Sequence, residues 1–243
     1  MDNRSLKVAV IDMNNGAPNQ GIRGIQEILS RFKNENNIDL SFDIFDLRQK
    51  GEIPGIGYDA YISSGGPGSP IESKGEQWEN DLENLKMISQ NPKCLAIGEC
   101  GLDALVNIDE NLQKKVFEAQ ILWANQIQKP VIIHCVRKFQ ELIPFQKIAK
   151  VPLIVHGFNK KKAIADEMLK HGFYLSFGKS VLHNLSLQTS LKEIPLEKIF
   201  LETDDADFDI AELYQKVAEI KEISVEKLQE QISKNLEILN IQF

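Results

Sequence analysis

Residues 130–135 read Pro-Val-Ile-Ile-His-Cys, an apolar run that ends near a histidine, and residues 153–158 repeat the pattern as Leu-Ile-Val-His-Gly-Phe. Similar short runs recur along the chain, separated by longer segments in which apolar residues return every three or four positions. Short runs of this kind are typical of buried parallel strands. The return of apolar residues every three or four positions in the segments between them is typical of amphipathic helices. The sequence therefore predicts an α/β fold made of repeated strand and helix units.

Roughly eight runs are candidate strands, the number that a closed TIM-barrel-like (β/α)8 fold needs. They are residues 7–12, 40–45, 60–63, 94–98, 131–134, 153–156, 173–176 and 199–202. Helices are expected at residues 22–33, 78–89, 111–128, 137–150, 160–171, 210–223 and 225–239, the last with Ser224 as its N-cap. Residues 46–59 are glycine-rich, contain Pro54 and leave little room for a crossover helix. The first part of the chain is therefore not expected to wind like an ordinary barrel segment.

The composition restricts the classes of function. The 243 residues include 28 Lys and Arg against 35 Asp and Glu, a net charge of −7. This charge excludes the broad basic surface on which non-specific nucleic-acid binding depends. The three cysteines lack the spacing of a disulfide framework or zinc finger, and the apolar runs are too short for a secretory signal or a membrane span. We expect a cytoplasmic protein without a membrane anchor.

Four side chains that can bind metal ions follow or end four separate candidate strands. They are Glu99, His134, His156 and Asp204. Because the carboxyl ends of parallel strands meet at one edge of a sheet, these groups are expected to gather in one crevice. Imidazole and carboxylate ligands suit Zn, Mn, Fe or Co. One such histidine alone is more often structural, but the repetition of the placement favours a divalent metal site.

At these residues the sequence resembles the TatD-type metal-dependent hydrolases of the amidohydrolase superfamily, over about residues 94–243. The matching motifs are Ile97-Gly98-Glu99-Cys100-Gly101-Leu102-Asp103, Pro130–Cys135, Val155–Phe158, Leu175–Gly178 and Leu201-Glu202-Thr203-Asp204. The resemblance implies a TIM-barrel-like (β/α)8 fold of that superfamily and a metal ion (Zn, Mg or Mn) as cofactor. It implies that Glu99 bridges two metal ions and that His134 and His156 complete the ligand shell of one of them. It also implies that Asp204 binds the other ion and orients or deprotonates the attacking water.

The family's first-strand His-x-His pair is missing, because no histidine precedes His134. One metal position has therefore lost most of its ligands, whereas the other keeps Glu99, His134 and His156 with room for a water. Asp12 and Asn14 have the spacing of the missing pair, and their substitution for it is a hypothesis beside their ordinary role as loop and capping residues.

The first part of the chain, about residues 6–78, resembles the start of a class I glutamine amidotransferase. The resemblance rests on Val8–Asp12 as a first strand and on Tyr58–Pro70 with its Gly65-Gly66-Pro67-Gly68 turn. It implies a flavodoxin-like N-terminal portion, but the Gly-x-Cys-x-Gly elbow and the His-Pro-Glu of that family are absent, which argues against amidotransferase activity. We expect a single α/β barrel-like domain over residues 1–243, built from an amidotransferase-like segment, 1–80, and a TatD-like segment, 90–243.

Two functions follow from these observations. The first is hydrolysis of a phosphodiester at a DNA or RNA end, with a divalent ion, with Glu99 and Asp204 as catalytic residues and with Arg137 as a phosphate-binding residue. The alternative is a catalytically impaired chimera, natural or engineered, that binds at most one metal ion. Neither requires a membrane or an obligate protein partner.

Overall fold

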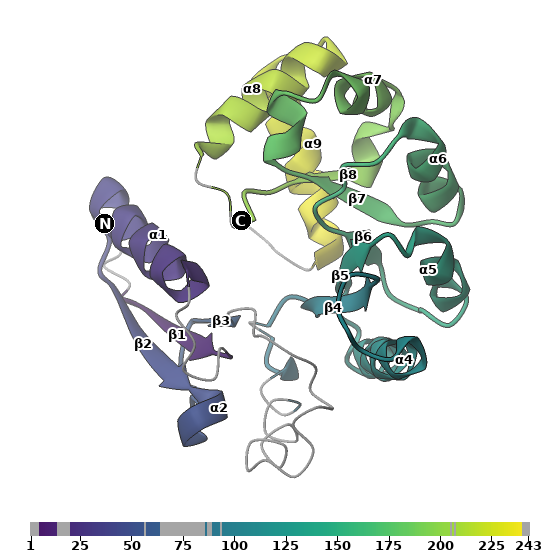
Figure 1. Cartoon of the computed structure of the whole chain (residues 1–243). Helices are drawn as coiled ribbons and strands as arrows, with labels where there is room; N and C mark the ends of the chain where they lie inside the picture. Colours follow the sequence, from purple (N-terminus) through teal and green to yellow (C-terminus); the bar gives the residue numbers. More distant parts are fainter. Residues whose placement is uncertain are drawn as a thin grey trace. The chain divides into compact units, whose positions relative to one another are not determined.

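The computed structural model describes residues 5–13, 20–55, 57–63, 86, 89–92, 94–204, 206 and 208–239. The chain divides into two compact units, Met1–Cys94 and Leu95–Phe243, which are drawn in Figure 1. The boundary lies close to the predicted junction between segments 1–80 and 90–243. The organisation of the chain as one barrel-like domain stays a prediction.

The first unit contains a parallel sheet whose first strand lies in the middle. Its described elements are β1 (Leu6–Asp12), α1 (Gln20–Asn36), β2 (Leu40–Asp46), α2 (Leu47–Lys50) and β3 (Ala60–Ser63). The strand order is β2-β1-β3, and both pairings are parallel. A small core of Val8, Val10, Leu29 and Leu40 joins α1 to this sheet. In a barrel with sequential strands, β2 would lie between β1 and β3. Here β1 lies between β2 and β3, so these strands do not follow the sequential order.

The strand predictions for this unit agree with the structure within one residue at each end. The central position of β1 is the order expected of a flavodoxin-like segment, although three strands do not define that fold and the assignment stays a prediction. The Gly-Gly-Pro-Gly turn and most of the helix expected at 78–89 lie outside the described residues.

The second unit is a five-stranded parallel sheet with its strands in sequential order, β4-β5-β6-β7-β8. The strands are β4 (Ile97–Asp103), β5 (Val131–Val136), β6 (Leu153–Val155), β7 (Tyr174–Phe177) and β8 (Ile199–Leu201). The helices are α4 (Glu110–Ile127), α5 (Phe139–Gln146), α6 (Lys162–Lys170), η2 (Lys179–Leu182), α7 (Leu185–Glu193), η3 (Leu196–Lys198), α8 (Ile210–Lys221), α9 (Val225–Leu236) and η4 (Glu237–Leu239). Helices α4 to α7 follow one another along the outer side of the strands (Figure 1).

The core of the second unit lies between these strands and helices. Residues such as Val131, Ile133, Leu153 and Val155 are fully or almost fully buried and pack with apolar residues of the helices, including Phe117. Burial of this apolar surface is the main stabilising contribution to the unit. Within the residues that the structure describes, no helix combines the length and the apolar character needed to cross a membrane.

Two sequence predictions for this unit need correction, and one is confirmed. β4 runs from Ile97 to Asp103, whereas residues 94–98 were predicted, because the glycines at 98 and 101 resemble strand breakers in sequence but permit close strand pairing here. Helix α7 was not predicted, since its apolar residues are few, and Asn184 caps it by accepting a hydrogen bond from Leu187 N. The N-cap prediction at Ser224 is confirmed, because its side chain accepts from Lys227 N.

Gly101 allows β4 to approach β5 closely. It has a φ of 154°, and a Cβ atom built on it would lie 2.0 Å from the carbonyl oxygen of His134, its partner in the β-ladder. Any side chain at this position would push the two strands apart. Glycine at 101 is therefore needed for the spacing of two strands that carry predicted site residues.

Gly101→Ala is expected to lower the free energy of unfolding of the second unit by about 3 kcal/mol, because backbone strain and overpacking combine. Chemical denaturation followed by circular dichroism measures this change. Gly24→Ala is the matched control, since its Cβ would meet nothing within 4 Å and alanine is the better helix former in α1. Equal stability of the Gly101→Ala variant and the wild type would contradict the close-approach argument.

Candidate metal centre

Three of the predicted ligands project from neighbouring strands of the second unit. Glu99 belongs to β4, His134 belongs to β5, and His156 directly follows β6. The register pairs Gly101 with His134, and it shifts between Ile97 and Cys100, the stretch of β4 that contains Glu99. The pairing of β5 with β6 continues as His156 N donates to Ile133 O at 3.0 Å.

The ligand atoms of these three residues meet. Nε2 of His156 lies 3.1 Å from Oε2 of Glu99 and 3.1 Å from Nδ1 of His134. One ligand atom from each residue lies within 4.8 Å of the others. The convergence expected at the carboxyl ends of parallel strands is therefore present for Glu99, His134 and His156.

This donor set fits a divalent cation. Two imidazole nitrogens and one carboxylate oxygen are a usual protein contribution to a catalytic zinc site, which keeps another position for water or substrate. Ligands about 2.1 Å from a tetrahedral ion lie about 3.4 Å apart, near the two 3.1 Å separations. The side chain of His156 is 10% exposed, whereas those of Glu99 and His134 are 50% and 42% exposed, so one side of the cluster is open to solvent.

Carboxylates dominate the electrostatics of the cluster. Glu202 and Glu99 raise the pKa of His156 to about 10, because both stabilise its charged form. The hydrogen bond with His156 in turn lowers the pKa of Glu99. A carboxylate therefore faces each ring nitrogen of His156, Glu99 at Nε2 and Glu202 at Nδ1. This negative charge favours a proton or another cation at these nitrogens.

Glu202 was not predicted as a site residue, yet it supports His156. Its Oε1 lies 3.8 Å from Nδ1 of His156 and accepts a hydrogen bond of 2.5 Å from Gly157 N. Its Oε2 accepts a hydrogen bond from the hydroxyl of Ser176, a buried residue of β7. The sequence signal for Glu202 is its position directly after the apolar run Ile199–Leu201. The sequence prediction instead placed the functional carboxylate two residues later, at Asp204.

Asp103 is a second carboxylate that sequence reasoning missed. Its Oδ2 lies 3.2 Å from Nε2 of His134, the ring nitrogen on the side away from His156. It stands two residues after Gly101, in the part of β4 where the register with β5 is regular, so the alternation of side chains places it on the same face as His134. This spacing was available in the sequence, but β4 was predicted to end at residue 98.

The remaining predicted site residues do not join the three-residue cluster. Asp204 is exposed, follows β8 with a φ of 52°, and is not among the ligand atoms that lie within 4.8 Å of one another. Arg137 is exposed directly after β5, where its φ is 59°. Asp12 ends β1 in the first unit, and Asn14 lies outside the described residues. The proposed roles of these residues stay predictions.

The two cysteines beside the ligands contribute packing. Burial raises the pKa of Cys100 to about 12 and that of Cys135 to about 11. Their thiols therefore stay protonated near neutral pH and are poor metal ligands or nucleophiles. The two other histidines lie at helix ends, where His171 contacts Glu167 at 3.0 Å and His183 follows η2.

Comparison with known proteins identifies a family through a sequence model. The sequence model of the TatD related DNase family matches residues 56–239, beginning inside the segment 6–78 that resembles an amidotransferase. The uncharacterized metal-dependent hydrolase YabD of Bacillus subtilis is 30% identical over 62% of this chain and 66% of its own length. The 3'-5' ssDNA/RNA exonuclease TatD of Edwardsiella piscicida is 32% identical over 52% of this chain and 51% of its own length. The chain thus spans about half to two thirds of the length of these relatives.

Solved structures show the same fold. YJJV, a TatD homologue from Escherichia coli, superposes with a TM-score of 0.69 and 17% identity, covering 97% of this chain and 98% of its own. A TatD family hydrolase from Entamoeba histolytica gives a TM-score of 0.63 at 17% identity, over 95% and 84% of the two chains. These likenesses concern the fold alone.

Binding of one divalent ion per chain is expected, and His156→Ala should weaken it by about 100-fold or more, because one of three ligands is lost. Isothermal titration of the metal-free protein with Zn²⁺ measures both quantities. His171→Ala is the matched control, since His171 also contacts a carboxylate but stands at the end of α6. The metal-centre assignment fails if the two variants bind Zn²⁺ equally well.

Proposed function

The chain belongs to the TatD related DNase family, and from this membership we propose that it is a metal-dependent hydrolase that cleaves phosphodiester bonds of DNA or RNA. The observation that carries the proposal is the convergence of ligand atoms from Glu99, His134 and His156 within 4.8 Å. The printed names of relatives support the choice of substrate, since one is a 3'-5' ssDNA/RNA exonuclease and another, from Homo sapiens, is a 3'-5' RNA nuclease.

In this proposal the three clustered side chains hold the ion. His156 is the most buried of the three ligands, whereas Glu99 and His134 are partly exposed to solvent. When bound, a divalent ion supplies Lewis acidity that makes a water molecule a nucleophile at neutral pH. The open side of the cluster leaves room for the substrate phosphate.

Two further residues have roles in the proposal. Asp204, in the loop after β8, accepts the proton of the attacking water as a general base. The guanidinium of Arg137, exposed directly after β5, binds a phosphate oxygen. The net charge of −7 is compatible with this substrate, because recognition of a strand end requires few phosphate contacts.

One observation favours a second candidate, a catalytically impaired chimeric scaffold. The four histidines of the chain are His134, His156, His171 and His183, so the first-strand pair of the family has no counterpart. The ion held by the remaining cluster would then bind without efficient hydrolysis. Metal binding alone does not separate the two candidates, whereas turnover does.

The discriminating measurement is release of nucleotides from single-stranded DNA and RNA labelled at either end, with Mg²⁺, Mn²⁺ or Zn²⁺. We expect metal-dependent release from the 3' end, lowered by about 100-fold or more in Glu99→Ala because a ligand is removed. Glu167→Ala, a glutamate of α6 next to His171, is the matched control and should keep full activity. Ion binding without any release would favour the impaired scaffold, and activity that survives Glu99→Ala would refute the proposed site.

A further inference from the structure

We propose that Asp103 is a positioning residue that holds the proton of His134 on Nε2 and so keeps Nδ1 of His134 free to bind the cation. The proposal rests on the metal site of the proposed function and adds a residue that fixes one of its ligands. It arises from the two contacts that the His134 ring makes on its opposite sides.

The geometry of His134 determines where its proton lies. Nε2 is 3.2 Å from Oδ2 of Asp103, and Nδ1 is 3.1 Å from Nε2 of His156. A neutral imidazole carries one N–H, and an ionised carboxylate can only accept a hydrogen bond. The proton therefore belongs on the nitrogen that faces Asp103. The lone pair of Nδ1 then points to the same place as the ligand atoms of His156 and Glu99.

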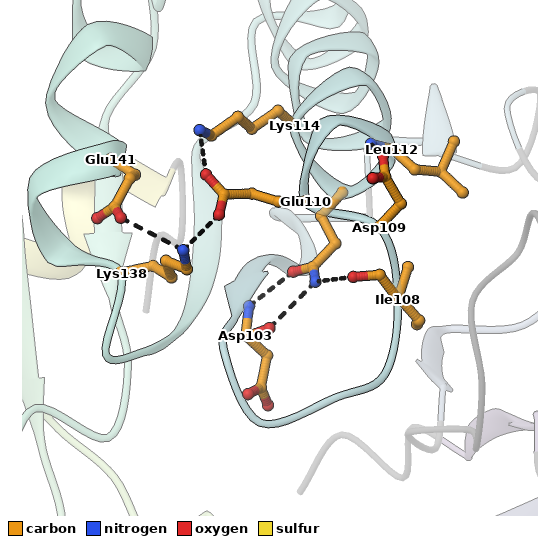
Figure 2. A network of polar contacts seen from close by, with 9 residues as sticks. Asp103, Ile108, Asp109, Glu110, Leu112, Lys114, Lys138 and Glu141 are labelled. Carbon is orange, nitrogen blue, oxygen red and sulfur yellow. Dashed lines mark hydrogen bonds and ion pairs between the residues drawn. The ribbon is translucent and has the colours of Figure 1, made fainter.

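Asp103 is itself held by hydrogen bonds at its backbone and its side chain, of which Figure 2 draws those at the backbone. Its backbone N donates to Oε1 of Gln113 at 2.8 Å, and Nε2 of Gln113 donates back to the carbonyl of Asp103 at 3.1 Å. Oδ1 of Asp103 accepts from Leu105 N at 2.7 Å, which leaves Oδ2 for His134. A carboxylate restrained in this way can fix the rotation of an imidazole as well as its tautomer.

The start of α4 connects this carboxylate to the next strand. Gln113 lies in the first turn of α4, which Asp109 caps by accepting from Leu112 N at 2.9 Å. Glu110 of the same turn pairs with Lys138, just after β5, and Figure 2 draws this pair. The first turn of α4 therefore contacts the carboxyl end of β4 and the segment that follows His134 in β5.

Replacing Asp103 by asparagine reverses the preference of the ring. The amide keeps the size of the side chain, but its NH₂ group can donate to Nε2, which places the proton of His134 on Nδ1. That proton occupies the lone pair that the cation needs and must move before binding. Loss of such a carboxylate partner typically lowers metal affinity by about 10–100-fold.

The test begins with the metal-free protein. Long-range ¹H–¹⁵N correlation spectra distinguish the two neutral tautomers of histidine, and the four histidines of this chain give few signals to assign. Spectra are recorded from about pH 8.5 to pH 11, because Glu202 and Glu99 raise the pKa of His156 to about 10 and only uncharged His156 leaves both tautomers of His134 open. We expect Nε2–H for His134 in the wild type and a population of Nδ1–H in Asp103→Asn. Asp166→Asn, which alters a carboxylate paired with Lys162 on α6, is the matched control and should leave His134 unchanged.

Titration with Zn²⁺ completes the test, with a 10–100-fold weaker affinity expected for Asp103→Asn and none of this loss for Asp166→Asn. A wild-type His134 that carries its proton on Nδ1, or on both nitrogens, overturns the proposal even if Asp103→Asn fails to fold. An unchanged tautomer or an unchanged affinity in Asp103→Asn also overturns it. Absence of Zn²⁺ binding by the wild type would refute the metal site of the proposed function, whereas the metal-free spectra would still decide the role of Asp103.

Discussion

The parallel register of β4, β5 and β6 is the constraint on which the candidate site depends. It brings together the strands that carry Glu99, His134 and His156, so that these side chains meet although 57 positions separate the first from the last in the sequence numbering. The register between β4 and β5 in turn requires a close approach that only glycine at position 101 permits. A backbone contact between two strands therefore positions the polar side chains that carry the proposed chemistry.

Around this cluster, each histidine has a carboxylate on the side away from the common centre. Asp103 faces Nε2 of His134, and Glu202 faces Nδ1 of His156. Both carboxylates accept backbone hydrogen bonds from their surroundings, which fixes them and favours imidazole rings that present one nitrogen to the centre. The cluster thus resembles a binding site formed before its ion arrives, an arrangement that lowers the free-energy cost of binding.

The first unit differs from the second in the way its strands pair. β1 lies between β2 and β3, whereas β4 to β8 follow one another in order. The family match begins at residue 56 and therefore includes β3, while the resemblance of the earlier residues to an amidotransferase stays a prediction. The strand order β2-β1-β3 is one that a flavodoxin-like segment also has.

The sequence by itself determined the α/β class, the position of most strands and the three residues of the cluster. It did so because apolar runs, helical periods and the residue after a strand are local signals. It did not determine the limits of β4, helix α7, or the roles of Asp103 and Glu202. Those depend on which strands approach one another and on which ring nitrogen a distant carboxylate faces. Hydrogen bonds between residues about 30 to 45 positions apart exist only after the sheet has formed, and only the tertiary structure decides them.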